Sequence, residues 1–130
     1  MNIQTFYNSF RDMELSGVSN LASVPHQIST AQLPAKYVKY IDSQFNIATL
    51  QNKFGLPNHT FDIVFLIEPV GQNTNIINQT LCMTIADNIY AALDTIDFVV
   101  DATITSDIQV INAFRYWALT VTVGVIDDGN

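Results

Sequence analysis

Two long β-type segments, residues 98–105 and 115–126, constrain the fold more than any other part of the sequence. Apolar residues recur at every second position in both, which is the pattern of strands that bury one face. In the second segment the inward face is expected to hold Trp117, Leu119, Val121, Val123 and Val125, and the opposite face Tyr116, Ala118, Thr120, Thr122 and Gly124. Small and polar residues on that opposite face predict a central strand whose second face is only partly covered.

The first of these segments carries negative charge. Its predicted faces are Phe98, Val100, Ala102 and Ile104 on one side, and Asp97, Val99, Asp101 and Thr103 on the other. Residues 107–112 follow with a short apolar middle, and we predict a turn there.

A long amphipathic pattern over residues 75–93 precedes the two segments and predicts a helix, with Asn73 or Thr74 as its N-cap. Cys82, the only cysteine, lies within this pattern, so no disulfide framework exists. Its apolar neighbours predict a small core-facing side chain.

The first half of the chain adds a second helix and two more strands. Apolar spacing predicts a helix over residues 3–15 that Gly17 terminates, and prolines make residues 18–35 an irregular connector. Strands are predicted at residues 37–41 and 61–68, with a loop or hairpin tip at 46–60 between them. The order predicts one α+β domain over residues 1–130, with an antiparallel or mixed sheet of about four or five strands and both helices on one face.

The composition favours a protein that buries surface against partners. Hydrophobic residues make up 48% of the 130 residues and charged residues only 13%. No apolar run approaches the ~20 residues of a membrane span, so we expect no membrane association. The apolar excess has to lie in the core or at interfaces, which are depleted in charge.

The acidic balance argues against nucleic acid as a bound ligand. Twelve acidic and five basic residues give a net charge of −7, whereas phosphate binding requires lysines and arginines. The only cluster of basic residues is the pair Lys36 and Lys39. An acidic surface suits a conduit past which DNA slides, and it also suits simple solubility.

The sequence shows no pattern of catalysis, cofactor binding or metal binding. His26 and His59 lie in proline-containing loops, where we expect solvated surface residues. Catalytic, zinc and phosphate-loop motifs are absent, so we predict no enzyme and no cofactor. The first residues lack a basic region followed by an apolar run, so we expect synthesis in the cytoplasm.

Five residues near the two C-terminal segments are the candidate functional residues: Asp97, Asp101, Asp107, Arg115 and Tyr116. The aspartates are too widely spaced for a calcium-type loop. Two interpretations remain open, a solvated sheet face or a subunit interface or pore lining in which Arg115 pairs with one of the carboxylates.

Four segments of the chain, taken in their sequence order, resemble the tail-terminator (tail-completion) proteins of long-tailed bacteriophages. They are the short first helix, the connector with Thr30-Ala-Gln-Leu-Pro34, the helix at 75–93, and the strand Tyr116-Trp-Ala-Leu-Thr-Val-Thr-Val123. The resemblance implies a virion protein that forms a homo-hexameric ring at the head-proximal end of the tail tube. Such a ring ends tube polymerisation and contacts the tail-tube protein and the neck or connector proteins, and DNA passes through it without specific recognition.

Other functions remain open. The chain could be a head–tail connector or neck ring protein, or a tail-tube subunit. A different class, a small-molecule-binding regulatory module, would use the loop at residues 57–59 and Tyr116 to line a pocket.

Overall fold

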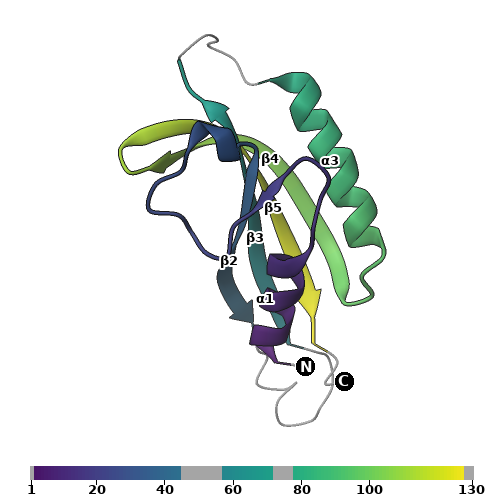
Figure 1. Cartoon of the computed structure of the whole chain (residues 1–130). Coiled ribbons are helices and arrows are strands. Elements are labelled where there is room, and N and C mark those ends of the chain that lie inside the picture. The colour runs from purple at the N-terminus through teal and green to yellow at the C-terminus, as the bar shows by residue number, and fades with distance from the viewer. Residues whose placement is uncertain (1, 45–56, 72–77, 128–130) are drawn as a thin grey trace.

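The computed structural model describes residues 2–44, 57–71 and 78–127, which form a five-stranded sheet with helices α1 and α3 on one face (Figure 1). The strand order is β1-β2-β3-β5-β4, with β1 and β2 parallel and the other pairs antiparallel. The strands are β1 (Ser19–Asn20), β2 (Ala35–Gln44), β3 (Asn58–Pro69), β4 (Val99–Ile111) and β5 (Phe114–Ile126). The predicted α+β fold with a mixed sheet is confirmed.

Both helices are shorter than predicted. Helix α1 (Ile3–Asp12) ends before Gly17 because Met13 already has extended backbone angles (φ −66°, ψ 123°). Helix α3 (Gln79–Asp94) starts at Gln79, where the Asn78 side chain accepts a hydrogen bond from the Leu81 amide at 3.1 Å. The N-cap prediction was therefore wrong, and residues 73–77, where the helix was expected to start, lie outside the described residues.

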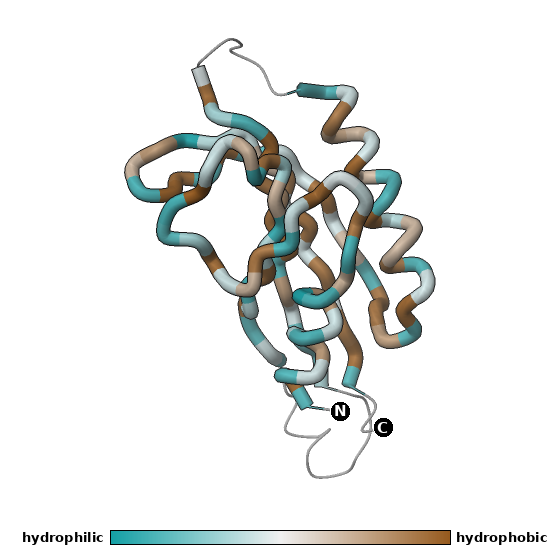
Figure 2. The backbone as a smooth tube through the Cα atoms, viewed as in Figure 1, coloured by the Kyte–Doolittle hydropathy of each residue, from teal (hydrophilic) through white to brown (hydrophobic). Residues whose placement is uncertain are grey.

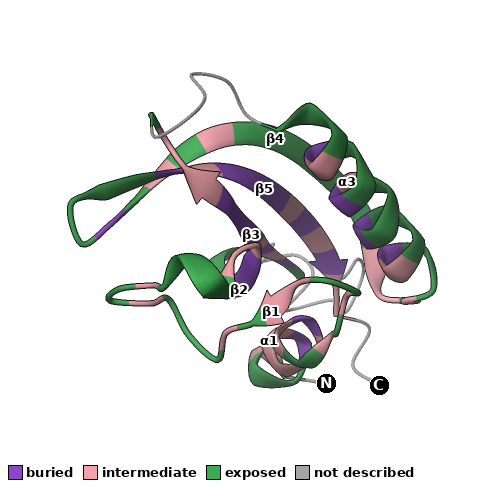
Figure 3. Cartoon of the chain, turned by 45° about the horizontal axis from the view of Figure 1, so that its top comes forward, coloured by how far each residue is buried: buried purple, intermediate pink, exposed green. Residues whose placement is uncertain are grey.

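The main core lies between the helices and one face of the sheet. Hydrophobic and hydrophilic residues alternate along α3 (Figure 2), and the buried side of α3 faces the sheet (Figure 3). The buried residues are Phe6 and Phe10 of α1, Cys82, Ile85, Ile89 and Leu93 of α3, and Val38, Phe61, Ile63, Phe65, Ile67, Leu119, Val121, Val123 and Val125 of the sheet. The predicted inward face of β5 and the core position of Cys82 are confirmed.

A second core covers the opposite face of the sheet, where the sequence predicted partial exposure. It contains Tyr37, Val64, Leu66, Ile111, Tyr116 and Ala118, with Leu21, Ile28 and Leu33 of the connector packed over it. A short 3₁₀ helix, η1 (Thr30–Gln32), shapes the connector and is closed by reciprocal hydrogen bonds between Ser29 and Gln32. Tyr116 and Thr120 are therefore buried rather than open.

The hairpin formed by β4 and β5 is longer than predicted. Strand β4 continues through residues 107–111, and the chain reverses at Asn112 and Ala113, with φ of 50° and 67°. Two successive residues with positive φ suit a two-residue hairpin turn, whose twist matches that of the strands. The predicted turn at 107–112 was wrong, because an exposed strand tolerates the polar residues that suggested a loop.

A β-bulge at the start of β4 changes which residues share a face. The pairing shifts between Val99, which lies opposite Val125, and Asp101, which lies opposite Gly124. Val99 packs against the helix-side core, whereas Asp101 lies on the other face over Gly124, where a Cβ would collide with the Asp101 carboxylate. The prediction that Val99 and Asp101 share a face was wrong, since a bulge inserts one residue into the alternation.

Candidate subunit interface

Strand β4 is an open edge of the sheet. Among the described residues it pairs only with β5, and most of its length is exposed (Figure 3). In an antiparallel pair, alternate residues direct their N–H and C=O groups away from the partner strand. A long edge of this kind is a template for pairing with another chain unless it is covered.

A groove of about 260 Å³ lies between α3 and the start of β4. Its lining is mainly apolar: Tyr90, Leu93, Ile96, Val99, Val100, Ala102 and Ile104. Asp94 and Asp101 also line it, but the Asp101 carboxylate lies on the other face of the sheet, over Gly124. Tyr90 is 70% exposed although it is aromatic. The groove therefore has an apolar floor with one acidic residue, Asp94, at its rim.

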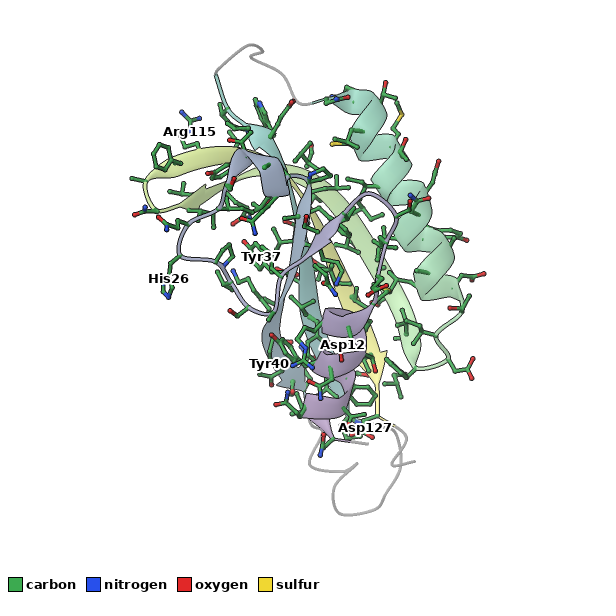
Figure 4. The ribbon with its side chains drawn as sticks, in the orientation of Figure 1. Asp12, His26, Tyr37, Tyr40, Arg115 and Asp127 are labelled. Atoms are coloured by element: carbon green, nitrogen blue, oxygen red, sulfur yellow. The ribbon has the colours of Figure 1, made fainter. Side chains whose placement is uncertain are left out.

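The tip of the β4–β5 hairpin carries exposed apolar side chains at the other end of the same strands. Val110 is 62% exposed and Phe114 is 65% exposed. Arg115, also exposed, follows Phe114 and lies at the outer end of the hairpin (Figure 4). We call residues 110–115 the hairpin tip.

The structure distributes the five candidate residues over the whole length of the hairpin. Asp97 is exposed between α3 and β4, and Asp101 is exposed at the start of β4 with its carboxylate over Gly124. Asp107, near the middle of β4, accepts hydrogen bonds from the Thr120 hydroxyl at 3.1 Å and the Gln109 amide at 3.2 Å. Tyr116 belongs to the second core, so its side chain is not part of the free surface.

Arg115 cannot pair with Asp101 within one chain. The register places Asp101 opposite Gly124, nine residues from Arg115 along β5. At about 3.4 Å per residue this is roughly 30 Å. A salt bridge between Arg115 and Asp101 therefore requires two copies of the chain.

His59 is not a solvated loop residue, contrary to the prediction. It is 2% exposed on β3, with its Nδ1 2.7 Å from the Ser43 hydroxyl and its Nε2 3.6 Å from an Asp127 carboxylate oxygen. The ring of Phe6 packs against it at 5.7 Å between centroids. A general base has to reach its substrate, and a ring buried under Phe6 is instead placed to join the ends of β2, β3 and β5.

The other predicted polar features also have clear positions. His26 is exposed on the connector, as expected (Figure 4). Lys36 is 1% exposed, and its Nζ donates hydrogen bonds to the carbonyls of Phe10 (2.9 Å) and Arg11 (3.2 Å) and to the Asn20 side chain (2.7 Å). Burial lowers the pKa of Lys36 to about 8. The pair Lys36 and Lys39 is therefore not a basic surface patch.

In the described part of the chain, no group of three or more His, Cys, Asp or Glu side chains is placed to hold a metal ion. None of the described helices combines the length and apolarity needed to cross a membrane. No protein-family model and no curated protein matches the chain. The function is therefore argued from the geometry of the β4 edge, the groove and the hairpin tip.

Proposed function

We propose that this chain is a structural subunit of a ring that caps the head-proximal end of a phage tail tube. The ring ends tube polymerisation and joins the tail to the head or neck. The sequence resemblance suggests this role, and one structural observation supports it. That observation is the concentration of unprotected surface along one hairpin: the open edge of β4, the apolar groove beside α3 and the apolar tip.

Monomeric proteins normally shield such surface. Natural edge strands are shortened, charged, bulged or covered, whereas β4 has 13 residues with Val100, Ile104, Ile108 and Val110 among its exposed side chains. The bulge near Val100 is the one irregularity in its register with β5. A second copy of the chain would remove this surface from water.

The arrangement favours a ring over a closed pair. The groove lies at one end of the hairpin and the tip at the other, so the two surfaces are far apart on one subunit. Contacts between different surfaces of identical subunits are heterologous, and they close into rings when the rotation between subunits permits. The net charge of −7 is compatible with a lumen through which DNA passes without binding.

The test combines mass measurement with tube growth. The purified chain is expected to form a ring of about six copies by light scattering and negative-stain microscopy. Added to polymerising tail-tube protein, it should bind one end of each tube and shorten the tubes as its concentration rises. A chain that stays monomeric at millimolar concentration and leaves tube length unchanged would contradict the proposal.

The same assay separates the alternatives within phage assembly. A connector or neck ring would form a ring but leave tube length unchanged. A tail-tube subunit would itself grow into tubes. Either outcome would replace the terminator role while retaining assembly as the function.

A specific cavity keeps small-molecule binding as a second candidate. A cleft of about 580 Å³ lies between the connector and the base of the hairpin, lined by Gln27, Ile28, Ser29, Thr30, Gln32, Pro69, Val70, Ile111, Asn112, Phe114, Arg115 and Tyr116. Its size lies within the range of about 300–1,000 Å³ for ligand pockets. His59 does not line this cleft, so the predicted pocket formed jointly by the loop at 57–59 and Tyr116 was wrong.

A further inference from the structure

We infer that the hairpin tip of one copy inserts into the α3–β4 groove of the next copy, with Phe114 as the apolar anchor and Arg115 beside the carboxylate of Asp94. This contact would hold the proposed ring together. Its role in a ring rests on the proposed function. Every subunit would then give one tip and receive one.

The groove matches a side chain better than a metabolite. Its volume of about 260 Å³ is below the range of about 300–1,000 Å³ that drug-sized ligands occupy. Its floor of Leu93, Ile96 and Val99 is apolar, and Tyr90 stands exposed beside it. Aromatic side chains buried in apolar pockets are the commonest anchors of protein interfaces, and Phe114 is the most exposed phenylalanine in the described chain.

Charge complementarity selects the tip as the occupant. Asp94 lines the groove, and Asp97, three residues later, is exposed between α3 and β4. Arg115 and Lys39 are the two exposed basic residues among those described. Complementary charges at the rim of an apolar contact favour the correct partner and its orientation.

Lys39 is the weaker candidate because of its strand. It lies in the middle of β2 (Ala35–Gln44), opposite Asp62 of β3, so it does not stand at a projecting end of the sheet. The hairpin tip instead projects at the outer end of β4 and β5, away from α3 (Figure 1).

The backbone of the tip supports a functional role. Ala113 has a φ of 67°, a left-handed conformation in which an L-residue with a Cβ is strained. Glycine is the usual residue at this position of a two-residue turn. Strain that is retained at an exposed position is typical of functional loops, and here it sits between the exposed side chains of Val110 and Phe114.

A complementation experiment tests the contact directly. Phe114→Asp removes the anchor but leaves the groove, and Tyr90→Asp blocks the groove but leaves the tip. Each variant alone should be monomeric by light scattering, whereas an equimolar mixture should form a 1:1 heterodimer. This result requires a contact between the tip of one copy and the groove of another, because the mixture contains one intact tip and one intact groove.

Controls keep a negative result interpretable. Tyr90 and Phe114 are exposed in the subunit, so both variants should keep the thermal unfolding midpoint of the monomer. Met83→Asp places the same charge at an exposed position of α3 outside the groove, and it should assemble like the original chain. Arg115→Glu should raise the dissociation constant of the heterodimer at least tenfold at low salt and less at about 1 M salt, where charges are screened.

The outcomes separate this inference from the proposed function. If both single variants assemble and cap tubes like the original chain, the contact lies elsewhere and the ring function stands. If the single variants are monomeric but their mixture forms no heterodimer, the tip does not occupy the groove and the inference is overturned. If the original chain forms the predicted contact but does not affect tube length, the inference stands and the terminator role fails.

Discussion

Lys36 closes the C-terminal end of α1 with three hydrogen bonds from one buried ammonium group. The last carbonyl groups of a helix have no partner within the helix, and Lys36 reaches two of them from β2 while it also binds Asn20 of β1. One side chain therefore connects α1, β1 and β2.

Lys36→Met should lower the free energy of unfolding by about 1–3 kcal/mol, because it leaves buried carbonyl oxygens without donors. Urea denaturation measures the loss. Lys39→Met is the matched control, since Lys39 is exposed on the same strand, and surface changes usually remain within about 0.5 kcal/mol. Equal effects at the two positions would contradict the structural role of Lys36.

The contribution of Lys36 to stability should rise with pH in a defined alkaline window. Burial lowers the pKa of Lys36 from 10.5 to about 8 in the folded chain. Between these two pH values Lys36 binds more protons in the unfolded chain than in the folded chain, so its contribution to the free energy of unfolding increases with pH. Burial raises the pKa of Cys82 and of Tyr37, and these two groups contribute in the opposite direction. Urea denaturation at a series of pH values should therefore show a free energy of unfolding that rises with pH in the original chain relative to Lys36→Met, which keeps Cys82 and Tyr37. Parallel pH profiles for the two chains would show that Lys36 keeps its ordinary pKa.

The environment of His59 shows why single residues are hard to place from sequence. Its proline-containing segment suggested a solvated loop, but β3 begins at Asn58, so His59 is a strand residue. Its partners Ser43 and Asp127 come from distant parts of the chain. Only tertiary pairing brings them together.

At the scale of elements, α3 begins at a cap that links it to the sheet. The side-chain oxygen of Asn78 accepts a hydrogen bond from the Leu81 backbone amide at 3.1 Å. The backbone amide of Asn78 donates to the Glu68 carboxylate of β3 at 3.1 Å. The helix is thus fixed at its start as well as along its buried face.

Asn78→Ala should lower the free energy of unfolding by about 0.5–2 kcal/mol, the usual range for the loss of an N-cap side chain. Asn78→Asp should retain most of the stability, because aspartate also accepts the Leu81 amide and interacts favourably with the helix N-terminus. Thermal unfolding of the two variants compares them. A loss in Asn78→Asp as large as in Asn78→Ala would contradict the assigned cap.

Strands were predictable from sequence where one face of the strand is buried against the layer of helices. The alternation of Leu119, Val121 and Val123 identified β5 and its inward face. The same reasoning failed on β4 for two reasons. A bulge at Val100 shifts the alternation of inward and outward residues. Most of the strand is also exposed, so polar residues such as Asp107 can occupy it. Bulges and edges depend on neighbouring strands, which periodicity does not report.

At the scale of the whole molecule, shape and charge favour self-assembly and disfavour the binding of nucleic acid. The apolar tip and groove favour self-association, whereas the net charge of −7 opposes contact with phosphates. Assembly and passage of DNA are therefore compatible in one chain.

The assembled chain should not bind duplex DNA tightly at physiological salt. Fluorescence anisotropy with a labelled duplex should give a dissociation constant weaker than about 10⁻⁴ M, the weak end of non-specific binding. A basic non-specific DNA-binding protein provides the positive control. A micromolar constant would show a basic surface that the described residues do not form, and would contradict a lumen that DNA passes without adhering.

Apolar periodicity and composition were enough to predict the α+β class, the helix-side core and the acidic balance, because they are local properties of the chain. The other features depend on tertiary contacts. These contacts bury Tyr116 under the connector, place Lys36 beneath the end of α1, and separate Arg115 from Asp101 by the length of the hairpin. These features arise from contacts between residues distant in sequence, so periodicity could not reveal them. Because of that last separation, a salt bridge between Arg115 and Asp101 can form only between two copies of the chain.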